Sequence, residues 1–493
     1  MTKTTLIDTT RRDDLSIDAS AVNSKAAREL YKKRLQIHPK LAHGTFRNLK
    51  WAAMVVLLVI YYITPWLRWD RGDGRPDQAV LIDFEGGRFY FFFIELWPQE
   101  VVYFAGLLIL AAFGIFLSSA LFGRVWCGYA CPQTVWTDLY IHVERWIEGD
   151  RNARMRLDKT PISASKVGKK FAKHTIWLLV AAATGGAWVF YFADAPLLFR
   201  EIFSGSANTT IYLFVGVLTF TTYALAGTMR EQVCTYMCPW PRIQAAMIDK
   251  DALSVTYRAD RGEPRGPHKK GESWEGRGDC IDCHQCVAVC PQGIDIRDGD
   301  QLECINCALC VDACDEVMRK VGRPTGLIAY DSYANQERRK QGRRTGYRLL
   351  RPRTVLYGVL MAAIAALMAY GLVTRTTLDM NVIRDRSPPF VRLADGSIRN
   401  DYVLKLINMT AHPRRLTIEV GGLDGARLQI AGTAGGDRIV TEARADGVTS
   451  VRLHVVAPAG IGAGSHPLYF TGRDLSSGES ARGDSAFFTG AAP

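Results

Sequence analysis

Residues 280–314 read CIDCHQCVAVCPQGIDIRDGDQLECINCALCVDAC and hold eight of the twelve cysteines of the chain. These eight form two sets with one internal spacing, C-x2-C-x2-C-x3-C. The first set is Cys280, Cys283, Cys286 and Cys290, and the second is Cys304, Cys307, Cys310 and Cys314. Pro291 follows the first set, whereas Asp315 follows the second. The repeated spacing predicts two equivalent binding sites.

This spacing is typical of bacterial ferredoxins that carry two iron–sulfur clusters. Three cysteines two residues apart can wrap a loop around a 4Fe-4S cubane, and the outlying cysteine of each run ligates the cluster of the other run. We therefore predict one 4Fe-4S cluster on Cys280, Cys283, Cys286 and Cys314, and a second on Cys304, Cys307, Cys310 and Cys290. The alternatives are weaker, because zinc sites use separated C-x2-C pairs and disulfides need an oxidising compartment.

Five apolar segments are candidates for membrane-spanning helices. At 493 residues the chain is also too long for one ordinary domain. The five segments are Trp51–Trp66, Val101–Leu121, Thr175–Phe192, Thr209–Gly227 and Thr354–Val373. The first fifty residues are polar and basic, so we expect no cleavable signal peptide.

The net charge of +12 is concentrated beside the apolar segments. Basic residues gather in 32–50, 151–173 and 338–353, whereas the loop between the third and fourth segments carries only Arg200. By the positive-inside rule the N-terminus is cytoplasmic and the region after the fifth span is periplasmic. All twelve cysteines then fall on the reducing, cytoplasmic side. We attribute the charge to topology and to anionic lipids, and we expect no nucleic-acid partner.

The remaining four cysteines form a short repeat, which follows the second and the fourth apolar segments. The first copy reads GRVWCGYACPQTVW, with Cys127 and Cys131, and the second reads GTMREQVCTYMCPWPR, with Cys234 and Cys238. Each copy has the pattern C-x3-C-P, and cysteines four residues apart lie on one face of a helix. Together the two pairs could bind Cu(I), hold another cluster or act as a thiol–disulfide couple. The alternative is four buried thiols without redox chemistry.

We expect five regions along the chain. After Met380, alternating apolar residues at Tyr402–Leu406, Leu416–Val420 and Val451–Val455 predict short strands of an immunoglobulin-like β-sandwich. The regions are a basic cytoplasmic segment 1–48, a four-span membrane domain 49–250, a cytoplasmic ferredoxin-like dicluster domain 251–353, a fifth transmembrane helix 354–374 and a periplasmic immunoglobulin-like domain 375–493. The fold class is therefore multi-domain, an α-helical membrane domain with an inserted ferredoxin-like domain and a C-terminal β-sandwich.

The chain resembles the cytochrome c oxidase accessory protein family CcoG, also called FixG, over essentially its whole length. The resemblance rests on the dicluster run, both C-x3-C-P motifs and the stretches RLQIHPKLAHGTFR, GRFYFFFIELWPQE and ERWIEGDR. It implies a protein of the bacterial inner membrane that reduces Cu(II) to Cu(I) for assembly of the cbb-type oxidase. Copper chaperones or a copper transporter would accept the Cu(I).

Two other functions stay open. One is a quinol-linked electron-transfer module that serves a periplasmic oxidoreductase, and the other is a non-catalytic assembly platform. No histidine lies inside the five spans, which disfavours a transmembrane haem relay, and no dinucleotide-binding glycine motif follows a strand. The electron donor is then a partner protein or a quinol.

Overall fold

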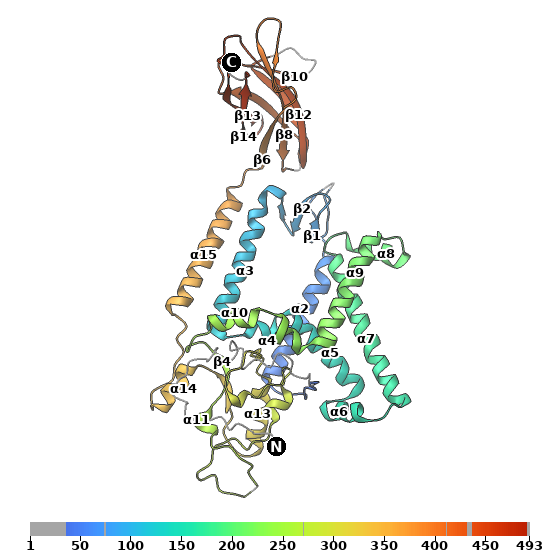
Figure 1. The fold of residues 1–493 in the computed structure, drawn as a ribbon, viewed down its shortest axis with the longest axis vertical. Helices are drawn as coiled ribbons and strands as arrows, with labels where there is room; N and C mark the ends of the chain where they lie inside the picture. The colour runs from blue at the N-terminus through green and yellow to red at the C-terminus, as the bar shows by residue number, and fades with distance from the viewer. Residues whose placement is uncertain (1–35, 73–74, 270, 411, 431–435, 491–493) are drawn as a thin grey trace. The chain divides into compact units, whose positions relative to one another are not determined.

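The computed structural model describes residues 36–72, 75–269, 271–410, 412–430 and 436–490 (Figure 1). The chain divides into two compact units, Met1–Ala366 and Leu367–Pro493. Most of the basic segment 1–48, with the short amphipathic helix that its sequence suggests near Ala27–Leu35, lies outside the described residues.

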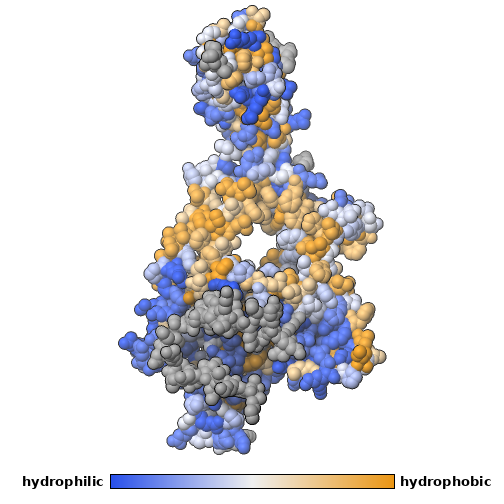
Figure 2. All heavy atoms as spheres, in the orientation of Figure 1, coloured by the Kyte–Doolittle hydropathy of each residue, from blue (hydrophilic) through white to orange (hydrophobic). Residues whose placement is uncertain are grey.

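Four helices in the described parts of the chain are long and apolar enough to cross a membrane, namely Thr45–Trp66, Pro98–Phe122, Thr209–Met229 and Pro352–Val373. Within the first unit their side chains are largely unburied, as at Leu107 and Phe220, which are 52% and 70% exposed. Hydrophobic residues accordingly gather on the surface around these helices (Figure 2). An apolar surface of this kind needs lipid around it, so the chain is a membrane protein. Four of the five predicted spans thus correspond to apolar helices of spanning length.

The third predicted span lies mostly within α7 (Ala164–Val189), which is helical but is not among those four. Its first turns carry Lys166, Lys169, Lys170 and Lys173. Its second half packs closely on α9 (Thr209–Thr222), where a Cβ added to Gly185 would lie 2.9 Å from the carbonyl oxygen of Val215. A fifth crossing therefore stays a prediction.

Short elements connect the long helices of the first unit. Between α2 (Thr45–Ile63) and α3 (Val101–Phe122), the strands β1 (Val80–Asp83), β2 (Arg88–Phe91) and β3 (Ile94–Leu96) form an antiparallel sheet. The sequence did not predict this sheet, because its aromatic run resembles a membrane-interface belt. The other helices up to the cysteine-rich region are η1 (Thr64–Trp66), η2 (Pro98–Glu100), α4 (Val125–Tyr129), α5 (Pro132–Glu148), α6 (Arg151–Lys159), α8 (Ala195–Ser204), the π-helices η3 (Tyr223–Met229) and η4 (Val233–Met237), and α10 (Trp240–Met247).

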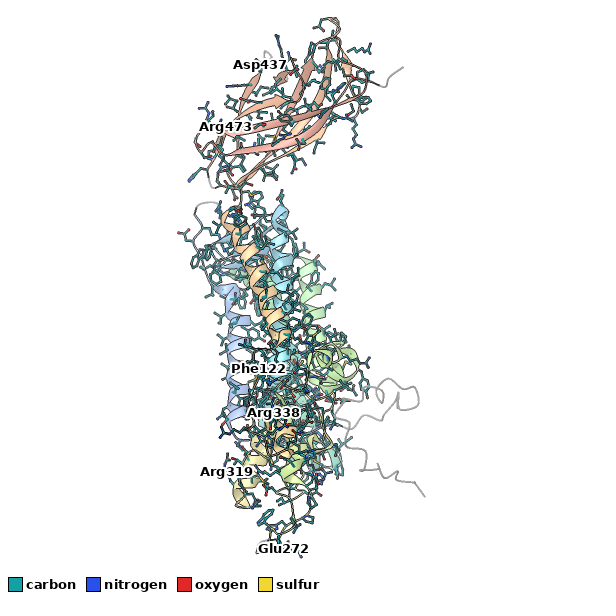
Figure 3. All side chains as sticks on the ribbon, turned by 90° about the vertical axis from the view of Figure 1, so that its left-hand side faces the viewer. Phe122, Glu272, Arg319, Arg338, Asp437 and Arg473 are labelled. Carbon is teal, nitrogen blue, oxygen red and sulfur yellow. The ribbon has the colours of Figure 1, made fainter. Side chains whose placement is uncertain are left out.

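The cysteine-rich region is built on two short helices and a two-stranded sheet. Strand β4 (Ser254–Tyr257) pairs antiparallel with β5 (Ile328–Asp331), and the cysteine loops lie between them in the sequence. Helices α12 (Gln285–Val289) and α13 (Leu309–Lys320) each begin within one cysteine run. The minor helices are α11 (Ala259–Gly262), η5 (Ile296–Asp298) and α14 (Tyr333–Lys340), and α15 (Pro352–Val373) follows. Figure 3 shows Arg338, Arg319 and Glu272 of this region progressively farther from Phe122, the last residue of α3.

The second unit is a β-sandwich, as the sequence predicts. One sheet has the order β10-β12-β8-β6 with β7 paired to β8, and the other has the order β11-β9-β13-β14. The alternation places Tyr402, Leu404, Leu416, Leu453 and Phe470 in a common core, where each is 0% exposed. The strands are β6 (Leu378–Arg384), β7 (Val391–Arg392), β8 (Ile398–Asn408), β9 (Arg414–Gly421), β10 (Arg427–Ile430), β11 (Arg438–Ala443), β12 (Gly447–Ala457), β13 (Ser465–Asp474) and β14 (Ser480–Phe488).

Candidate functional site

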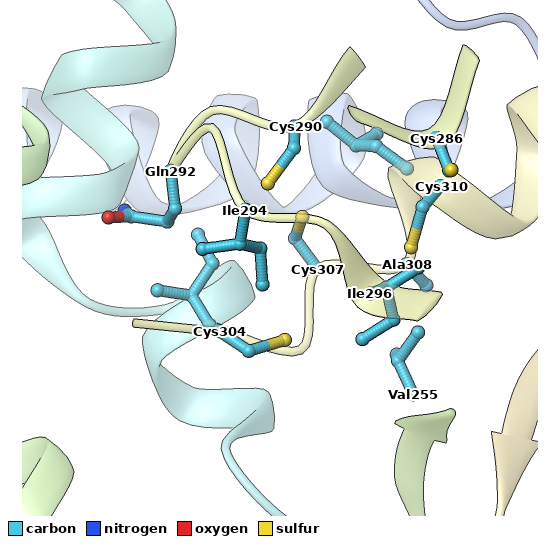
Figure 4. Close-up of a pocket in the computed structure, with 12 residues that line it drawn as sticks. Val255, Cys286, Cys290, Gln292, Ile294, Ile296, Cys304, Cys307, Ala308 and Cys310 are labelled. Carbon is cyan, nitrogen blue, oxygen red and sulfur yellow. The ribbon is translucent and has the colours of Figure 1, made fainter. Parts of the chain in front are cut away.

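Two cavities lined by cysteines lie in the cysteine-rich region. Cys304, Cys307, Cys310 and Cys290 line the first, together with Cys286 at its edge (Figure 4). Cys280, Cys283, Cys286 and Cys314 line the second. Each cavity thus combines three cysteines of one run with the last cysteine of the other. This is the arrangement in which two neighbouring clusters would exchange their fourth ligands.

The two loops that carry the leading cysteines have matching backbones. Asp282 and His284 flank Cys283 with φ angles of 56° and 51°, and Asn306 and Ala308 flank Cys307 with φ angles of 53° and 58°. Residues other than glycine rarely adopt this left-handed conformation, and alternation of left- and right-handed residues turns successive N–H groups toward one side. The same uncommon geometry in both loops indicates two equivalent anion-binding concavities.

The walls of both cavities are mostly apolar, with Gln292 as a polar side chain in the first and His284, Gln285 and Arg297 in the second. Val255, Ile294 and Ile296 line the first, and Tyr257, Leu327 and Ile328 line the second. Burial, with a further contribution from neighbouring cysteines, raises the pKa of Cys290, Cys304 and Cys314 to about 12. A set of four thiols in an apolar wall fits an iron–sulfur cluster, whose iron binds thiolates, and not a hard cation such as Mg²⁺.

A single-ion site is not preformed at these cysteines. Throughout the described ranges, no three His, Cys, Asp or Glu side chains converge in a way that could hold one metal ion.

The two C-x3-C-P motifs do not form the expected helical faces. Cys127 lies in α4, but Cys131 is the extended residue before α5, and Cys238 is likewise extended after η4, which contains Cys234. The prediction of two cysteines on one continuous helix is therefore wrong. The reason is the proline, which disfavours helical geometry at the residue before it and begins the next helix instead.

The four motif cysteines nevertheless lie together. Burial raises the pKa of Cys127 to about 12, and the nearby thiols of Cys131, Cys234 and Cys238 contribute to this shift. The Cys127 Sγ donates to Gln244 Oε1 at 3.1 Å, and Gln244 Nε2 donates to Ser119 Oγ at 3.1 Å. The two copies of the motif, far apart in the sequence, are thus neighbours in the fold.

The first motif packs directly on the cavity of Cys304 and Cys307. A Cβ added to Gly128 would lie 2.7 Å from the carbonyl oxygen of Ile305 and 3.1 Å from the Cα of Cys307. Tyr129 Oη donates to the carbonyl oxygen of Cys307 at 3.1 Å, and Arg124 donates to those of Leu302 and Cys304. The four motif thiols are thus neighbours of a predicted cluster site.

The second motif also lies next to this cavity. Cys234 lines a small polar cavity together with Pro291 and Gln292, the two residues that follow Cys290. The Gln292 side chain thus lies beside the Cys234 thiol. Both motifs therefore contact the loops of the Cys290, Cys304, Cys307 and Cys310 cavity.

A buried charge network supports these helices, and sequence reasoning missed it. Arg47 pairs with Asp138 through two hydrogen bonds of 2.9 and 2.6 Å, and both side chains are buried. The Asp312 carboxylate, from α13 between Cys310 and Cys314, accepts the backbone N–H of Phe46 at 3.2 Å and of Arg47 at 2.7 Å. These contacts attach α2 to α5 and to the cysteine-rich region. The one hint of these contacts in the sequence was that Arg47 lies in RLQIHPKLAHGTFR, a stretch on which the family resemblance rests.

Comparisons with known proteins match nearly the whole chain. A family model described as "4Fe-4S dicluster domain" matches residues 229–333, and one described as "4Fe-4S binding domain" matches 104–152. A third, described as an "IG-like fold at C-terminal of FixG", matches 368–490. The chain is 51% identical over 475 residues to nitrogen fixation protein FixG of Rhizobium meliloti, covering 90% of this chain and 91% of that protein. The chain belongs to the FixG family.

Two further FixG-family relatives come from Cereibacter sphaeroides. Protein RdxA is 51% identical, and the match covers 87% of this chain and 91% of RdxA. Protein RdxB is 48% identical, and the match covers 93% of this chain and 97% of RdxB. The two iron–sulfur family models together contain all twelve cysteines, including both C-x3-C-P pairs. This FixG-family chain is therefore a membrane-bound iron–sulfur protein of electron transfer.

Proposed function

We propose that this FixG-family protein holds two 4Fe-4S clusters and reduces Cu(II) to Cu(I) for assembly of the cbb-type oxidase. Cys280, Cys283, Cys286 and Cys314 would hold one cluster, and Cys304, Cys307, Cys310 and Cys290 the other. When bound, such clusters supply single electrons, and Cu(II) needs one electron to become Cu(I). The two four-cysteine cavities and the iron–sulfur family models support this assignment.

The observation that carries the copper assignment is the position of Cys127, Cys131, Cys234 and Cys238. These thiols neighbour one cluster cavity through Gly128 and Gln292. Thiolates prefer Cu(I) to Cu(II), so a site here would favour the reduced product. Since the four thiols are not arranged as ligands of one ion, copper would have to draw them together.

The topology proposed for this reaction has the N-terminus and residues 228–353 in the cytoplasm and residues 375–493 in the periplasm of the inner membrane. Cu(I) would leave by ligand exchange to a copper chaperone or transporter. The electron donor would be a partner protein or a quinol.

The copper assignment is tested with the full chain, purified without oxygen and reduced, by mixing it with Cu(II) and following Cu(I) with a colorimetric chelator. In the variant with Cys127, Cys131, Cys234 and Cys238 all changed to serine, cluster spectra should remain. Cu(I) formation should slow at least about tenfold, which corresponds to an activation barrier about 1.4 kcal/mol higher. Copper reduction at the parent rate would move the copper site elsewhere.

The cluster assignment has its own test. Cys290→Ser should disturb the electron paramagnetic resonance signal of the cluster held by Cys304, Cys307 and Cys310, because Cys290 lines that cavity. Cys314→Ser is the matched variant for the other cavity. If each variant instead damages the cluster of its own run, the ligands are not exchanged.

The two other functions differ in which compound should oxidise the reduced clusters. Reduced clusters that are oxidised by a quinone and not by Cu(II) would favour the quinol-linked module. Clusters that neither compound oxidises would favour a non-catalytic assembly platform.

A further inference from the structure

A pocket of about 360 Å³ lies among the helices of the first unit, away from both cysteine cavities. It is formed between α2, the start of α5, α7 and the α9–η3 helix, with Tyr61, Trp136, Thr184, Trp188 and Thr222 among its lining residues. Its volume falls within the range of about 300–1,000 Å³ that small-molecule sites occupy. Two of the helices that border it, α2 and α9, are apolar helices of spanning length.

The pocket opens toward the apolar surroundings of these helices. Trp188, which lines it, is 48% exposed, and Pro132 at its other edge is exposed as well. On α9 the neighbouring side chains Phe220 and Val217 are 70% and 50% exposed. A ligand would therefore enter from the lipid and would itself be largely apolar.

Three aromatic side chains and several hydroxyl groups shape the interior. Tyr61 and Trp136 meet edge to face with ring centroids 5.2 Å apart, and Trp188 adds a third ring. Thr184 Oγ1 accepts from Trp136 Nε1 at 2.9 Å and hydrogen-bonds Tyr62 Oη at 2.7 Å, while Tyr61 Oη donates to the Thr184 carbonyl oxygen at 2.8 Å. Aromatic walls with a few fixed polar groups suit a flat ring that carries oxygen atoms.

Gln133 connects this pocket to the motif cysteines. Its Nε2 donates to the carbonyl oxygen of Leu225 at 2.8 Å, so the amide is held in place and its oxygen is the acceptor that it can offer to a hydroxyl. The same side chain lines the polar cavity that contains Cys234 and Gln292. Pro132, at the pocket edge, directly follows Cys131. A ring in the pocket would thus lie one side chain away from the C-x3-C-P thiols.

We propose that this pocket binds the headgroup of a membrane quinol, whose hydroxyl can donate to Gln133 Oε1. A lipid acyl chain suits it less, because hydrocarbon would lie against the polar groups of Gln133 and Thr222 without offering them a hydrogen bond. The proposal concerns binding and stands apart from copper reduction. If the chain binds the quinol but does not reduce Cu(II), the pocket proposal stands and only the proposed function is overturned.

The test measures binding of a benzoquinol with a decyl tail, kept reduced without oxygen, to the full chain in detergent, by calorimetry. Thr222→Trp should fill the pocket and weaken binding at least about tenfold. Leu213→Trp, on α9 where the Leu213 side chain is 64% exposed, should change binding less than about twofold. Equal binding to the parent, Thr222→Trp and Leu213→Trp proteins would overturn the proposal.

A second variant guards against misfolding of the first and probes the polar contacts. Tyr61→Phe removes one acceptor hydroxyl and should weaken quinol binding about fivefold, whereas Tyr212→Phe, whose hydroxyl bonds to Ile202, should not. Decylbenzene, which has the tail and ring without oxygens, should bind more weakly than the quinol and should not respond to Tyr61→Phe. If decylbenzene binds as tightly as the quinol, the pocket is an acyl-chain groove and the proposal fails.

Discussion

Glu144 is the residue on which the buried charges of the first unit converge. Its carboxylate lies 2.7 Å from Arg230 Nη2, 2.9 Å from Arg154 Nη1 and 3.4 Å from Lys173 Nζ, and its side chain is 1% exposed. The three partners come from the end of η3, from α6 and from α7, so one carboxylate joins three elements to α5. Burial by itself raises the pKa of Glu144, but Arg230, Lys173 and Arg154 outweigh it and hold the pKa at about 2.

We expect Glu144→Gln to lower the free energy of unfolding by about 3–5 kcal/mol, because three cations stay buried without their shared anion. Denaturant unfolding of the detergent-solubilised chain, followed by circular dichroism, measures the change. The matched control is Glu316→Gln, which breaks an exposed pair with Lys320 and should cost less than about 1 kcal/mol. Similar losses in both variants would show that the network is not a structural anchor.

The same carboxylate predicts a dependence of stability on pH. The pKa of Glu144 is about 2 in the folded chain, below its ordinary value of 4.5, so the contribution of this carboxylate to stability, about 3 kcal/mol, is complete above the unfolded pKa. It is lost as the pH falls from about 4.5 to about 2. Parent and Glu144→Gln proteins should therefore converge in stability across this window, and a constant difference between them would contradict the assignment.

Gly128 is needed because two backbones meet at it. A methyl group there would lie 2.7 Å from Ile305 O, which is a backbone atom of the cysteine-rich loop. Gly128→Ala should shift that loop and destabilise the chain by about 1–3 kcal/mol. It should also alter the signal of the cluster assigned to Cys290, Cys304, Cys307 and Cys310 more than that of the other cluster. Gly168→Ala on α7, where nothing lies within 4 Å, is the control and should leave both signals unchanged.

Residue spacing predicted the two cysteine sets, since a cubane requires fixed intervals in the sequence. It could not predict Glu144 or Gly128, because their partners lie far along the chain, as with Arg230 and Ile305. Charged residues near apolar segments are also expected at membrane surfaces, so nothing in the sequence marked Glu144 or Asp138 as buried.

At the scale of elements, α2 shows how the cysteine-rich region fixes a membrane helix. The first N–H groups of a helix lack partners within it, and here the Asp312 carboxylate of α13 accepts two of them, from Phe46 and Arg47. Asp312 is only 6% exposed, and the helix start is positive, so an anion there is stabilising. The end of α2 is thereby tied to the helix that carries Cys310 and Cys314.

Asp312→Ala should therefore lower the unfolding free energy by about 1–2 kcal/mol, through loss of the cap. Asp312→Asn keeps an acceptor oxygen and should recover part of that loss. Thermal unfolding followed by circular dichroism compares the two variants. An Asp312→Ala protein as stable as the parent would mean that the carboxylate contributes no cap.

The elements themselves were predictable to different degrees. Long apolar runs predicted five spans, four of which correspond to apolar helices of spanning length, and strict alternation predicted the sandwich strands around Tyr402 and Leu453. The sequence placed Cys127 and Cys131 on one helix because their spacing fits a helical face, but the restriction that Pro132 imposes on Cys131 is stronger than that preference. The pocket beside Tyr61 was not predictable, since it needs α2, α5, α7 and α9 to be assembled first.

At the scale of the whole molecule, packing within the first unit bears on the number of membrane crossings. Gly128 follows α3 by a few residues and touches Ile305 and Cys307, so the end of α3 and the cysteine-rich region lie on one side of the membrane. The chain between Phe122 and Ile305 must then cross the membrane an even number of times. Because α9 is an apolar helix of spanning length, we infer that α7, which packs against it, crosses as well.

An even number of crossings between Phe122 and Ile305 predicts on which side of the membrane each loop lies. Reporter fusions should place Ser206, between α8 and α9, in the periplasm, Asp260 in the cytoplasm and Gly462 in the periplasm, the last because α15 adds a fifth crossing. Alkaline phosphatase, which is active only outside, and green fluorescent protein, which is fluorescent only inside, give opposite readings at each site. If α7 did not cross, Ser206 and Asp260 would exchange sides and Gly462 would report the cytoplasm. The iron–sulfur region would then lie on the oxidising side, away from the end of α3 that it contacts through Gly128.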